Sequence, residues 1–361
     1  MYDVIVVGAG PAGSRFARQA ATAGYDILLL EQGEVGRPLA CSGHVSLDIW
    51  KFVPDWARDE LFQNDIYGAR FHLDGPGSRA YPFYREQPIS NAIDRVGLDK
   101  ILATEAVEAG AELREGYTVT GFTERQTTVS VTARGPSGVE SFDGKLLAGA
   151  DGPRSRIRTE AGLPDPEQLF HGVLGFDSTP DADNFVDVHL TVPGFFAWRI
   201  PRGDAGVEYG LAVQPGDDAP RRFENLCAGY DAEINERCSG MIPIGPPRRT
   251  VTTRVFLLGD AAGQTKPFTG GGILYGMRAA DIAATVIDPD HPSTLQSYEH
   301  AWRAELGSDI LLGRLIRAAY SVPRPIQRMG MRIFSGKIGV HMDRPTSLLS
   351  REQLRAMLSR K

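Results

Sequence analysis

The sequence predicts a mixed α/β protein, α+β overall, in which a parallel sheet covered by helices carries an inserted antiparallel sheet and a helical tail. Three observations carry this prediction. Residues 4–7 form a continuous apolar run that leads into a glycine-rich turn and an amphipathic helix. Residues 166–250 instead contain short alternating runs separated by Pro and Gly, and residues 310–361 are basic with helical spacing. Parallel strands buried on both faces are continuously apolar, whereas antiparallel strands with one wet face alternate.

The length and composition indicate an ordinary globular protein. A chain of 361 residues holds two domains or one large one and buries enough surface to fold without a disulfide or structural metal. Its three cysteines, Cys41, Cys227 and Cys238, make a disulfide framework unexpected and indicate a reducing compartment. The first residues form a strand rather than a leader peptide, and no apolar stretch reaches the roughly 18 residues of a spanning helix. We therefore expect a soluble, cytoplasmic chain.

The charge is unevenly distributed along the chain. The net charge is −6, but residues 310–361 carry eleven Lys and Arg against two acids, Asp343 and Glu352. That tail is therefore +9 and the remainder −15. An anionic partner surface, such as a membrane, is one interpretation. A tail docked on the protein's own acidic body is the alternative.

The first elements of the chain can be placed in order. After the strand at residues 4–7, a helix should run from about Pro11 to Gly24, with Ala12, Phe16 and Ala20 on one face. A second amphipathic helix is expected at residues 94–113. Strands should follow, ending at the run that precedes Asp151.

Residues 221–241 interrupt the antiparallel pattern. Phe223, Cys227, Tyr230, Ile234, Cys238 and Met241 recur at helical spacing. This pattern predicts a helix in which Cys227 and Cys238 are core residues rather than functional ones.

A glycine fingerprint follows the first strand. Gly8, Gly10 and Gly13 form GxGxxG between a strand and a helix, and Glu31 ends the next strand 18 residues after Gly13. The first glycine allows a tight turn, the second lets the backbone approach a pyrophosphate, and the third permits close helix–strand packing. Glu31 is placed to accept hydrogen bonds from a ribose. The context predicts a dinucleotide site.

Two further motifs lie where apolar strands end. Residues 146–158 contain Asp151-Gly152, and residues 255–273 contain Gly259-Asp260 followed by Gly270-Gly271-Gly272. Asp260 can hold the hydroxyls of a sugar-alcohol chain. The glycine run opens another helix and offers free N–H groups to an electron-rich ring.

Together with Asp94-Arg95, these motifs resemble the FAD-dependent oxidoreductases of the glutathione-reductase-like fold, in the branch with aromatic hydroxylases. The resemblance spans residues 2–285 and implies FAD as cofactor, with a Rossmann-type FAD-binding domain. It implies that Asp260 binds the ribitol and that Arg95 lies near the pyrophosphate. The implied cofactor contacts are Gly8, Gly10, Ala12, Gly13, Glu31, Gln32, Cys41, Arg95, Val119, Asp151, Asp260, Gly270, Gly271, Gly272 and Ile273.

Three stretches are similar to the geranylgeranyl reductases, including those that saturate archaeal ether lipids: GQTKPFTGGGI, IPIGPPRRT and FFAWRIP. The last resembles an aromatic-x-Trp-x-aromatic-Pro signature in the substrate domain. On a strand, Phe196, Trp198 and Ile200 point to one side, as the wall of a polyprenyl cavity or as ordinary sheet packing. The implied substrate contacts are Phe196, Trp198, Ile200, Pro201, Lys266 and Pro267. Lys266 can stabilise negative charge on a reduced flavin, or it is an exposed surface lysine.

Two positions depart from this pattern, and other activities remain open. Ile200 stands where the family often has an aromatic residue, and Phe196 where it often has tyrosine. Trp-x-Ile-Pro is also similar to flavin-dependent halogenases, but neither Lys51 nor Lys100 lies in the context that a halogenase lysine requires. The alternatives are a flavin monooxygenase or halogenase on an apolar or aromatic substrate, and an FAD-binding lipid carrier or sensor.

The loop LACSGHVS raises the question of what Cys41 does. Near Cys41 in the sequence, His44 is the one other residue that could bind a metal, so no metal site is expected. No second cysteine lies at the short spacing of a redox pair, so no dithiol is expected either. The resemblance places this loop on the substrate side of the isoalloxazine. An isolated alkene needs a proton as hydride arrives, so we expect Cys41, His44 or a water between them to donate or relay it. Simple packing of Cys41 is the alternative.

The resulting prediction is an FAD-dependent reductase that saturates C=C bonds of geranylgeranyl chains, on archaeal-type ether phospholipids. The expected partners are the polyprenyl lipid, an anionic membrane surface and a transient donor (ferredoxin, reduced nicotinamide or deazaflavin), because no second GxGxxG exists. No nucleic acid is expected, and the location is cytoplasmic, peripheral on the cell membrane. The predicted FAD-binding domain comprises residues 1–70, 92–165 and 250–306, the substrate domain residues 71–91 and 166–249, and the basic helical region residues 307–361.

Overall fold

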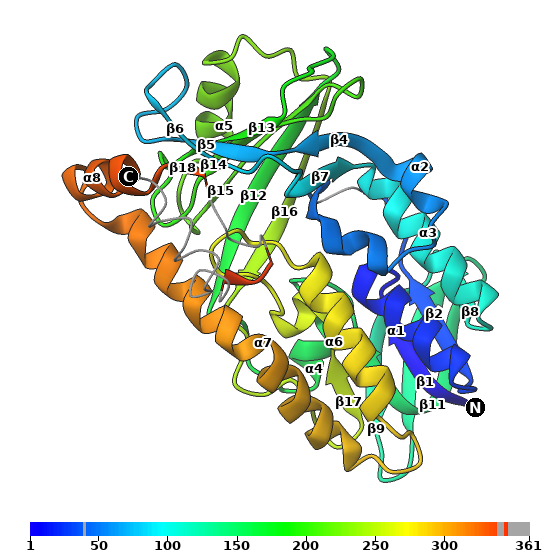
Figure 1. Ribbon diagram of the computed structural model, residues 1–361. Coiled ribbons are helices and arrows are strands. Elements are labelled where there is room, and N and C mark those ends of the chain that lie inside the picture. The colour runs from blue at the N-terminus through cyan, green and yellow to red at the C-terminus, as the bar shows by residue number, and fades with distance from the viewer. Residues whose placement is uncertain (39–40, 338–342, 346–361) are drawn as a thin grey trace.

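The computed structural model describes residues 1–38, 41–337 and 343–345, and contains a seven-stranded, an eight-stranded and a three-stranded sheet. In the view of Figure 1 the eight-stranded sheet lies in the upper part and the seven-stranded sheet in the lower part, with long helices beside them. This mixed architecture confirms the predicted fold class.

The seven-stranded sheet is parallel at its centre, where β1 pairs with both β2 and β11. Residues Val4, Ile5 and Val6 of β1 are fully buried, because helices cover one face and further strands and loops the other. The strands are β1 (Tyr2–Val7), β2 (Ile27–Glu31), β8 (Glu112–Glu115), β9 (Thr118–Glu124), β10 (Val129–Gly135), β11 (Gly138–Gly149) and β17 (Val255–Leu257).

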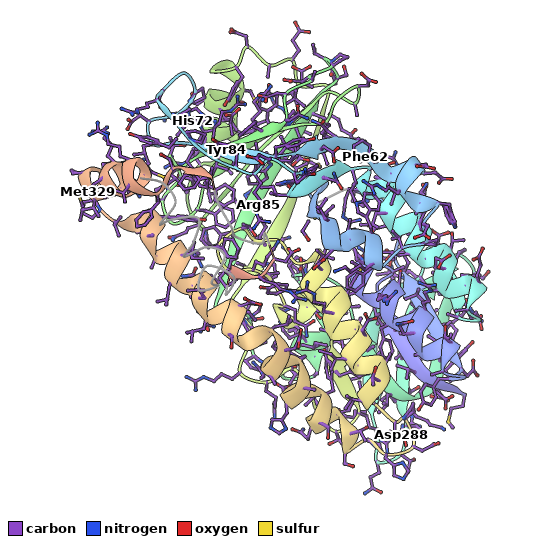
Figure 2. All side chains as sticks on the ribbon, viewed as in Figure 1. Phe62, His72, Tyr84, Arg85, Asp288 and Met329 are labelled. Carbon is purple, nitrogen blue, oxygen red and sulfur yellow. The ribbon has the colours of Figure 1, made fainter. Side chains whose placement is uncertain are left out.

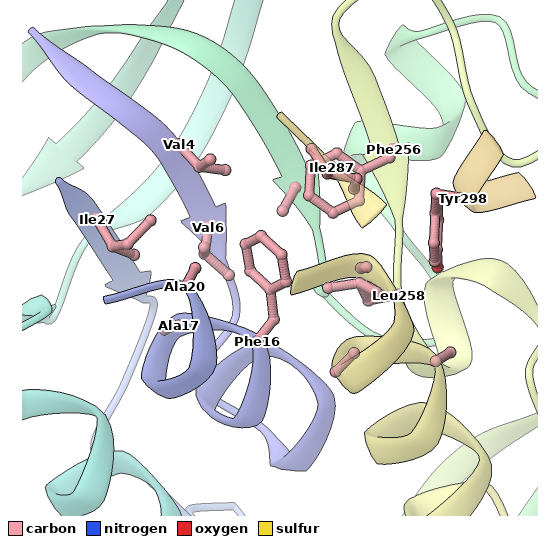
Figure 3. Packing of buried hydrophobic residues seen from close by; sticks show 14 of the residues in the cluster. Val4, Val6, Phe16, Ala17, Ala20, Ile27, Phe256, Leu258, Ile287 and Tyr298 are labelled. Atoms are coloured by element: carbon pink, nitrogen blue, oxygen red, sulfur yellow. The ribbon is translucent and has the colours of Figure 1, made fainter. Parts of the chain in front are cut away.

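The two helices predicted near the N-terminal half are present. They are α1 (Pro11–Thr22) and α3 (Arg95–Glu108), each slightly shorter than the sequence pattern indicated. With α6 (Ile273–Val286) and α7 (Thr294–Ala318), α1 covers a core in which the Phe16 and Phe256 ring centroids lie 5.2 Å apart (Figure 3). This core fixes the N-terminus of α1 at the carboxyl ends of β1 and β11.

The eight-stranded sheet joins segments that are far apart in sequence. Its order is β16-β12-β15-β14-β13-β5-β6-β18. The bounds are β5 (Gly68–His72), β6 (Ala80–Tyr84), β12 (Gln168–Asp177), β13 (Phe185–His189), β14 (Ala197–Pro201), β15 (Val207–Val213), β16 (Glu236–Ile244) and β18 (Gly336–Lys337). A separate sheet contains β3 (His44–Ser46), β4 (Phe62–Ile66) and β7 (Ser90–Ile93). The predicted domain boundaries remain a prediction.

The helix predicted across residues 221–241 is only half correct. The helix α5 spans Ala219–Ala228, but Cys238 lies in β16, paired with Leu174 of β12. The helical spacing of apolar residues continues past the end of α5 by chance. That later segment is a strand because β12 supplies hydrogen-bond partners that the local sequence does not reveal. Cys227, on α5 itself, is buried in the core between this helix and the eight-stranded sheet, as predicted.

The C-terminal region is helical up to Phe334, with the end of α7 and then α8 (Arg324–Phe334), and the short strand β18 follows. Residues 338–342 and 346–361 of the predicted basic region lie outside the described residues. The shorter helices are α2 (Ala57–Leu61), α4 (Arg156–Glu160), η1 (Leu47–Lys51), η2 (Gly259–Ala262) and η3 (Ala319–Ser321). Within the described ranges, no helix has the length and apolar character needed to cross a bilayer.

Candidate active site

A cavity of about 1350 Å³ is lined by residues from all three sheets and from α7 and α8. The predicted site residues on its wall are Gly10, Ala12, Glu31, Gln32, Cys41, His44, Arg95, Asp151, Phe196, Trp198, Ile200, Asp260, Lys266, Gly270, Gly271, Gly272 and Ile273. Pockets for one drug-sized ligand hold about 300–1,000 Å³. The cavity therefore has room for a cofactor together with part of a second molecule.

The glycine fingerprint divides into residues that build the turn and one that faces the cavity. Gly8 has a φ of +103°, and a Cβ there would clash with the Ala150 carbonyl; a Cβ at Gly13 would clash with the Gly8 carbonyl. Gly8 and Gly13 are therefore required for the turn and the packing of α1. A Cβ at Gly10 would meet no protein atom within 4 Å and would project toward the cavity, as expected where a pyrophosphate approaches the backbone.

Glu31 ends β2 beside this turn. One carboxylate oxygen accepts the Ala9 N–H at 2.8 Å and the other accepts the Gly33 N–H at 3.2 Å. These bonds orient the carboxylate on the cavity wall, and each oxygen retains a lone pair for a ribose hydroxyl.

Arg95 supplies buried donors at the start of α3. Arg95 is 6% exposed, and its Nη1 lies 2.5 Å from Asp99 Oδ1. Its Nε has no hydrogen-bond partner among the described residues. An unsatisfied guanidinium N–H on a cavity wall is costly unless an anion accepts it. The arrangement fits the pyrophosphate of FAD.

Asp260 and the glycine run form the next part of the wall. A Cβ at Gly272 would clash with Asp260 Oδ1, and one at Gly271 with the Lys266 side chain, so glycines are required for these close approaches. Burial raises the pKa of Asp260 to about 6, against the attraction of Arg95. A carboxyl of this kind can hold ribitol hydroxyls as acceptor or donor. Asp151 instead caps α4, accepting from Ser155 Oγ at 2.5 Å and from the Ile157 N–H at 3.1 Å.

Cys41 and His44 both reach the cavity, but in different surroundings. Burial raises the pKa of the Cys41 thiol, with Arg95 acting in the opposite direction, so the thiol keeps its proton at neutral pH. Burial, reinforced by the charge of Lys266, lowers the pKa of His44 to about 4, so the ring is neutral. Its Nε2 lies 2.7 Å from Ser90 Oγ. No hydrogen bond joins Cys41 to His44 within the described part of the chain.

Lys266 is buried rather than a surface lysine, so that alternative was wrong. It is 5% exposed, and its Nζ lies 2.5 Å from Oδ1 of Asp343, which is fully buried. Asp343 also accepts from Ser46 Oγ, and its carbonyl accepts from the Tyr275 hydroxyl at 3.1 Å. The C-terminal segment thus returns to the cavity wall and neutralises Lys266.

The other end of the cavity is apolar. Phe196, Trp198 and Ile200 share one buried cluster, and the Phe196 ring stacks on Phe195 with centroids 4.5 Å apart. Further apolar wall residues come from β4, β5, β6, β12, β13 and the C-terminal helices: Ile66, Phe71, Phe83, Leu174, Val186, Val188, Leu190, Ile316, Tyr320, Met331 and Phe334.

The chain is similar in sequence to known FAD-binding proteins. Two models described as FAD binding domains match residues 3–60 and 86–228. A protein named digeranylgeranylglycerophospholipid reductase 2 from Methanothermobacter thermautotrophicus is 32% identical over 340 residues, covering 86% of this chain and 85% of the relative. A relative of the same name from Methanopyrus kandleri is also 32% identical, covering 85% and 83%.

The chain belongs to the digeranylgeranylglycerophospholipid reductase family.

Solved structures agree on the fold. A geranylgeranyl bacteriochlorophyll reductase-like protein from Thermoplasma acidophilum has a TM-score of 0.84 at 22% identity, covering 100% of this chain and 96% of its own. A flavin-dependent brominase has a TM-score of 0.71 at 16% identity, covering 92% and 94%. At such identities these likenesses concern the fold alone. FAD is the cofactor of this reductase family member, and the halogenase and monooxygenase alternatives have less support.

Some predicted residues do not reach the cavity. Gly8 and Gly13 lie behind it, Val119 packs in the core of the seven-stranded sheet, Pro201 ends β14, and Pro267 packs near Gly313 of α7. Their assigned contacts remain predictions.

Several wall residues escaped prediction. From the sequence, Asp343 was noted only as one of two acids in a basic tail. Its place as a single acid among many basic residues was the one signal in the sequence that it has a specific partner. Residues from β4, β5 and α8 carried no motif, because their shared wall exists only in the folded chain.

Proposed function

We propose that this reductase saturates carbon–carbon double bonds of geranylgeranyl chains on a lipid, drawing electrons from a transient donor. The supporting observation is one cavity that joins the FAD-binding motifs to a long apolar wall ending at α7 and α8. Such a wall suits a polyprenyl chain better than a polar metabolite, because an isoprenoid gains mainly from burial of apolar surface.

The chemistry divides between the cofactor and the protein. Reduced FAD supplies the hydride equivalent. The protein must exclude water, align the alkene and provide a proton to the second carbon. The protonated Cys41 thiol is the candidate donor, and neutral His44 with Ser90 is the candidate relay.

The decisive experiment is anaerobic. The bound flavin is reduced with dithionite, a geranylgeranyl lipid is added, and reoxidation is followed by absorbance with mass analysis of the product. We expect reoxidation and a mass gain of two hydrogens per bond, and none with the fully saturated lipid as control. Turnover only with oxygen and a hydroxylated or halogenated product would support a monooxygenase or halogenase, and no turnover at all would support a carrier.

We further propose that the protein acts at an anionic membrane surface through an apolar ridge, defined as Leu311, Leu315, Ile326, Met329, Ile333 and Phe334. All six side chains are at least half exposed, and Met329 lies at the outer edge of the molecule (Figure 2). Ile326 and Phe334 of the ridge also line the cavity, together with Gly330 and Met331 of α8. A chain leaving the bilayer at the ridge would therefore reach the cavity directly.

Charge supports this surface only in part. Arg314 pairs with Glu167, and Arg317 donates to the Gly194 carbonyl, so both of these α7 arginines make contacts within the protein. Arg328 and Arg332 flank the ridge on α8, and the former is 47% exposed at its side chain while paired with Asp74.

Flotation with anionic vesicles tests the ridge. Met329→Glu combined with Ile333→Glu should abolish flotation, because two charges would enter the interface. Val139→Glu, at an apolar residue 66% exposed on a distant hairpin, is the matched control and should float as wild type does. Unchanged flotation of the double variant would exclude the ridge.

A further inference from the structure

A buried carboxylate connects the Cys41 loop to the aromatic wall. Glu208 of β15 is fully buried. Its Oε1 accepts the Trp198 indole N–H at 2.9 Å, and its Oε2 accepts the Gly43 N–H at 3.4 Å. One side chain therefore contacts a residue of the eight-stranded sheet and a residue two positions after Cys41.

The strand geometry explains how Glu208 reaches both. Along β15, Val207, Tyr209 and Leu211 pack under α5, so the alternating residue Glu208 faces the other side of the sheet, toward the cavity wall. Glu208 is not among the residues that line the cavity, but its carboxylate accepts from the indole of Trp198, which is. We therefore treat Glu208 as a residue that acts through Trp198 and not by contact with a substrate.

Neighbouring glycines make the arrangement tight. The indole of Trp198 lies against Gly210, where any Cβ would clash with the ring. On the other side, a Cβ at Gly43 would clash with the Ile93 carbonyl, and the Gly43 carbonyl accepts the Ile93 N–H at 2.9 Å. Both groups that Glu208 binds are therefore held against backbone, and the carboxylate lies between two nearly fixed donors.

We propose that Glu208 is a positioning residue that sets the Cys41 loop against the Trp198 wall, and so fixes where an alkene lies relative to the Cys41 thiol. A carboxylate suits this role because both of its oxygens accept, and the two donors are neutral N–H groups on opposite sides. A glutamine could satisfy only one of them and would point its own N–H group at the other. The catalytic consequence rests on the proposed reductase function, whereas the tether itself does not.

Glu208→Gln tests the tether without substrate. The amide oxygen should keep the shorter bond to Trp198, leaving the Gly43 N–H opposite an amide nitrogen and releasing the loop. The holoprotein is treated with iodoacetamide, and alkylation of each cysteine is followed by peptide mass mapping. Cys41 labelling should rise about fivefold, the ratio that corresponds to loss of a net hydrogen bond of about 1 kcal/mol. Cys227, buried on the inner side of α5, serves as internal reference, and its labelling should not change.

Glu299→Gln is the matched control for loss of a buried charge. Glu299 is 7% exposed and accepts from the Thr250 N–H and hydroxyl, and it is absent from the cavity wall. Its replacement should lower stability but leave Cys41 labelling unchanged. Equal labelling of Cys41 in wild type and Glu208→Gln, or an equal rise in Glu299→Gln, would overturn the proposal.

Trp198→Phe provides a second test should Glu208→Gln fail to fold. It removes one donor while the Gly43 bond persists, so Cys41 labelling should stay at the wild-type rate while the KM for the lipid rises. In Glu208→Gln, kcat for lipid-dependent flavin reoxidation should fall, with dithionite reduction of the flavin unchanged. A rise in Cys41 labelling in Trp198→Phe would indicate general loosening and refute the two-sided tether. Absence of lipid turnover in wild type would refute the proposed function and leave the labelling result standing.

Discussion

Asp343→Asn removes the charge that faces Lys266 Nζ across 2.5 Å while nearly preserving the shape of the side chain. Both groups are enclosed, with Asp343 fully buried and Lys266 5% exposed, so solvent cannot compensate the lysine that remains. Removing one partner of such a pair costs about 3–5 kcal/mol. We expect a loss of this size in the free energy of unfolding at pH 7.

The assay is urea unfolding with FAD at one saturating concentration, because bound cofactor shifts apparent stability. Lys266→Met should also lower the free energy of unfolding. The double variant should lose less stability than the two single variants added together, because it leaves no buried charge without its partner. Glu160→Gln is the control: Glu160 pairs with Arg156, 56% exposed, along α4, and its replacement should cost under about 1 kcal/mol.

The same pair predicts a pH dependence. Burial would raise the pKa of Asp343, but Lys266 and Ser46 outweigh it and hold the pKa below its usual value. A carboxyl with a depressed pKa contributes stability above its unfolded pKa of about 4, which is lost as the pH falls further. Asp343→Asn should therefore not show this loss of stability at acid pH. A cost below about 1 kcal/mol for Asp343→Asn, or strict additivity with Lys266→Met, would refute the reasoning.

Three further predictions concern the cavity. Gly10→Val should fold, because a Cβ there meets no protein atom, yet purify without yellow colour; full flavin content would contradict the pyrophosphate assignment. Cys41→Ser should keep fold and FAD but slow lipid-dependent flavin reoxidation by at least about tenfold, since positioned acids contribute about 10²–10⁴, whereas a wild-type rate would make Cys41 a packing residue. His44, whose pKa is about 4 in the fold and about 6.5 unfolded, contributes up to about 3 kcal/mol above pH 6.5 that is lost as the pH falls toward 4. In His44→Gln, the free energy of unfolding in urea should change less with pH between about 6.5 and about 4. His189, whose pKa is lowered in the same way, will still contribute some pH dependence. A pH dependence equal to that of wild type would contradict the burial of the His44 ring.

Local sequence determined the cofactor end of the molecule. In the turn after β1, Gly8 takes a φ of +103° and a Cβ at Gly13 would clash with the Gly8 carbonyl, so both requirements arise within one short stretch of sequence. Asp260 and Gly272 likewise lie within one short segment, and their contact follows from it. Strand and helix periodicity around these motifs predicted β1, α1 and α3, because buried strands and amphipathic helices impose distinct apolar spacings.

The tertiary structure alone decided how the substrate end is assembled. Cys238 carried a helical pattern yet became part of a strand, since pairing with β12 outweighed local spacing. Asp343 and Lys266 are separated by 77 residues, and Glu208 and Gly43 by 165. Such contacts arise because each buried charge or N–H group must find a partner somewhere in the folded chain, and the sequence near either residue contains no mark of which partner that will be.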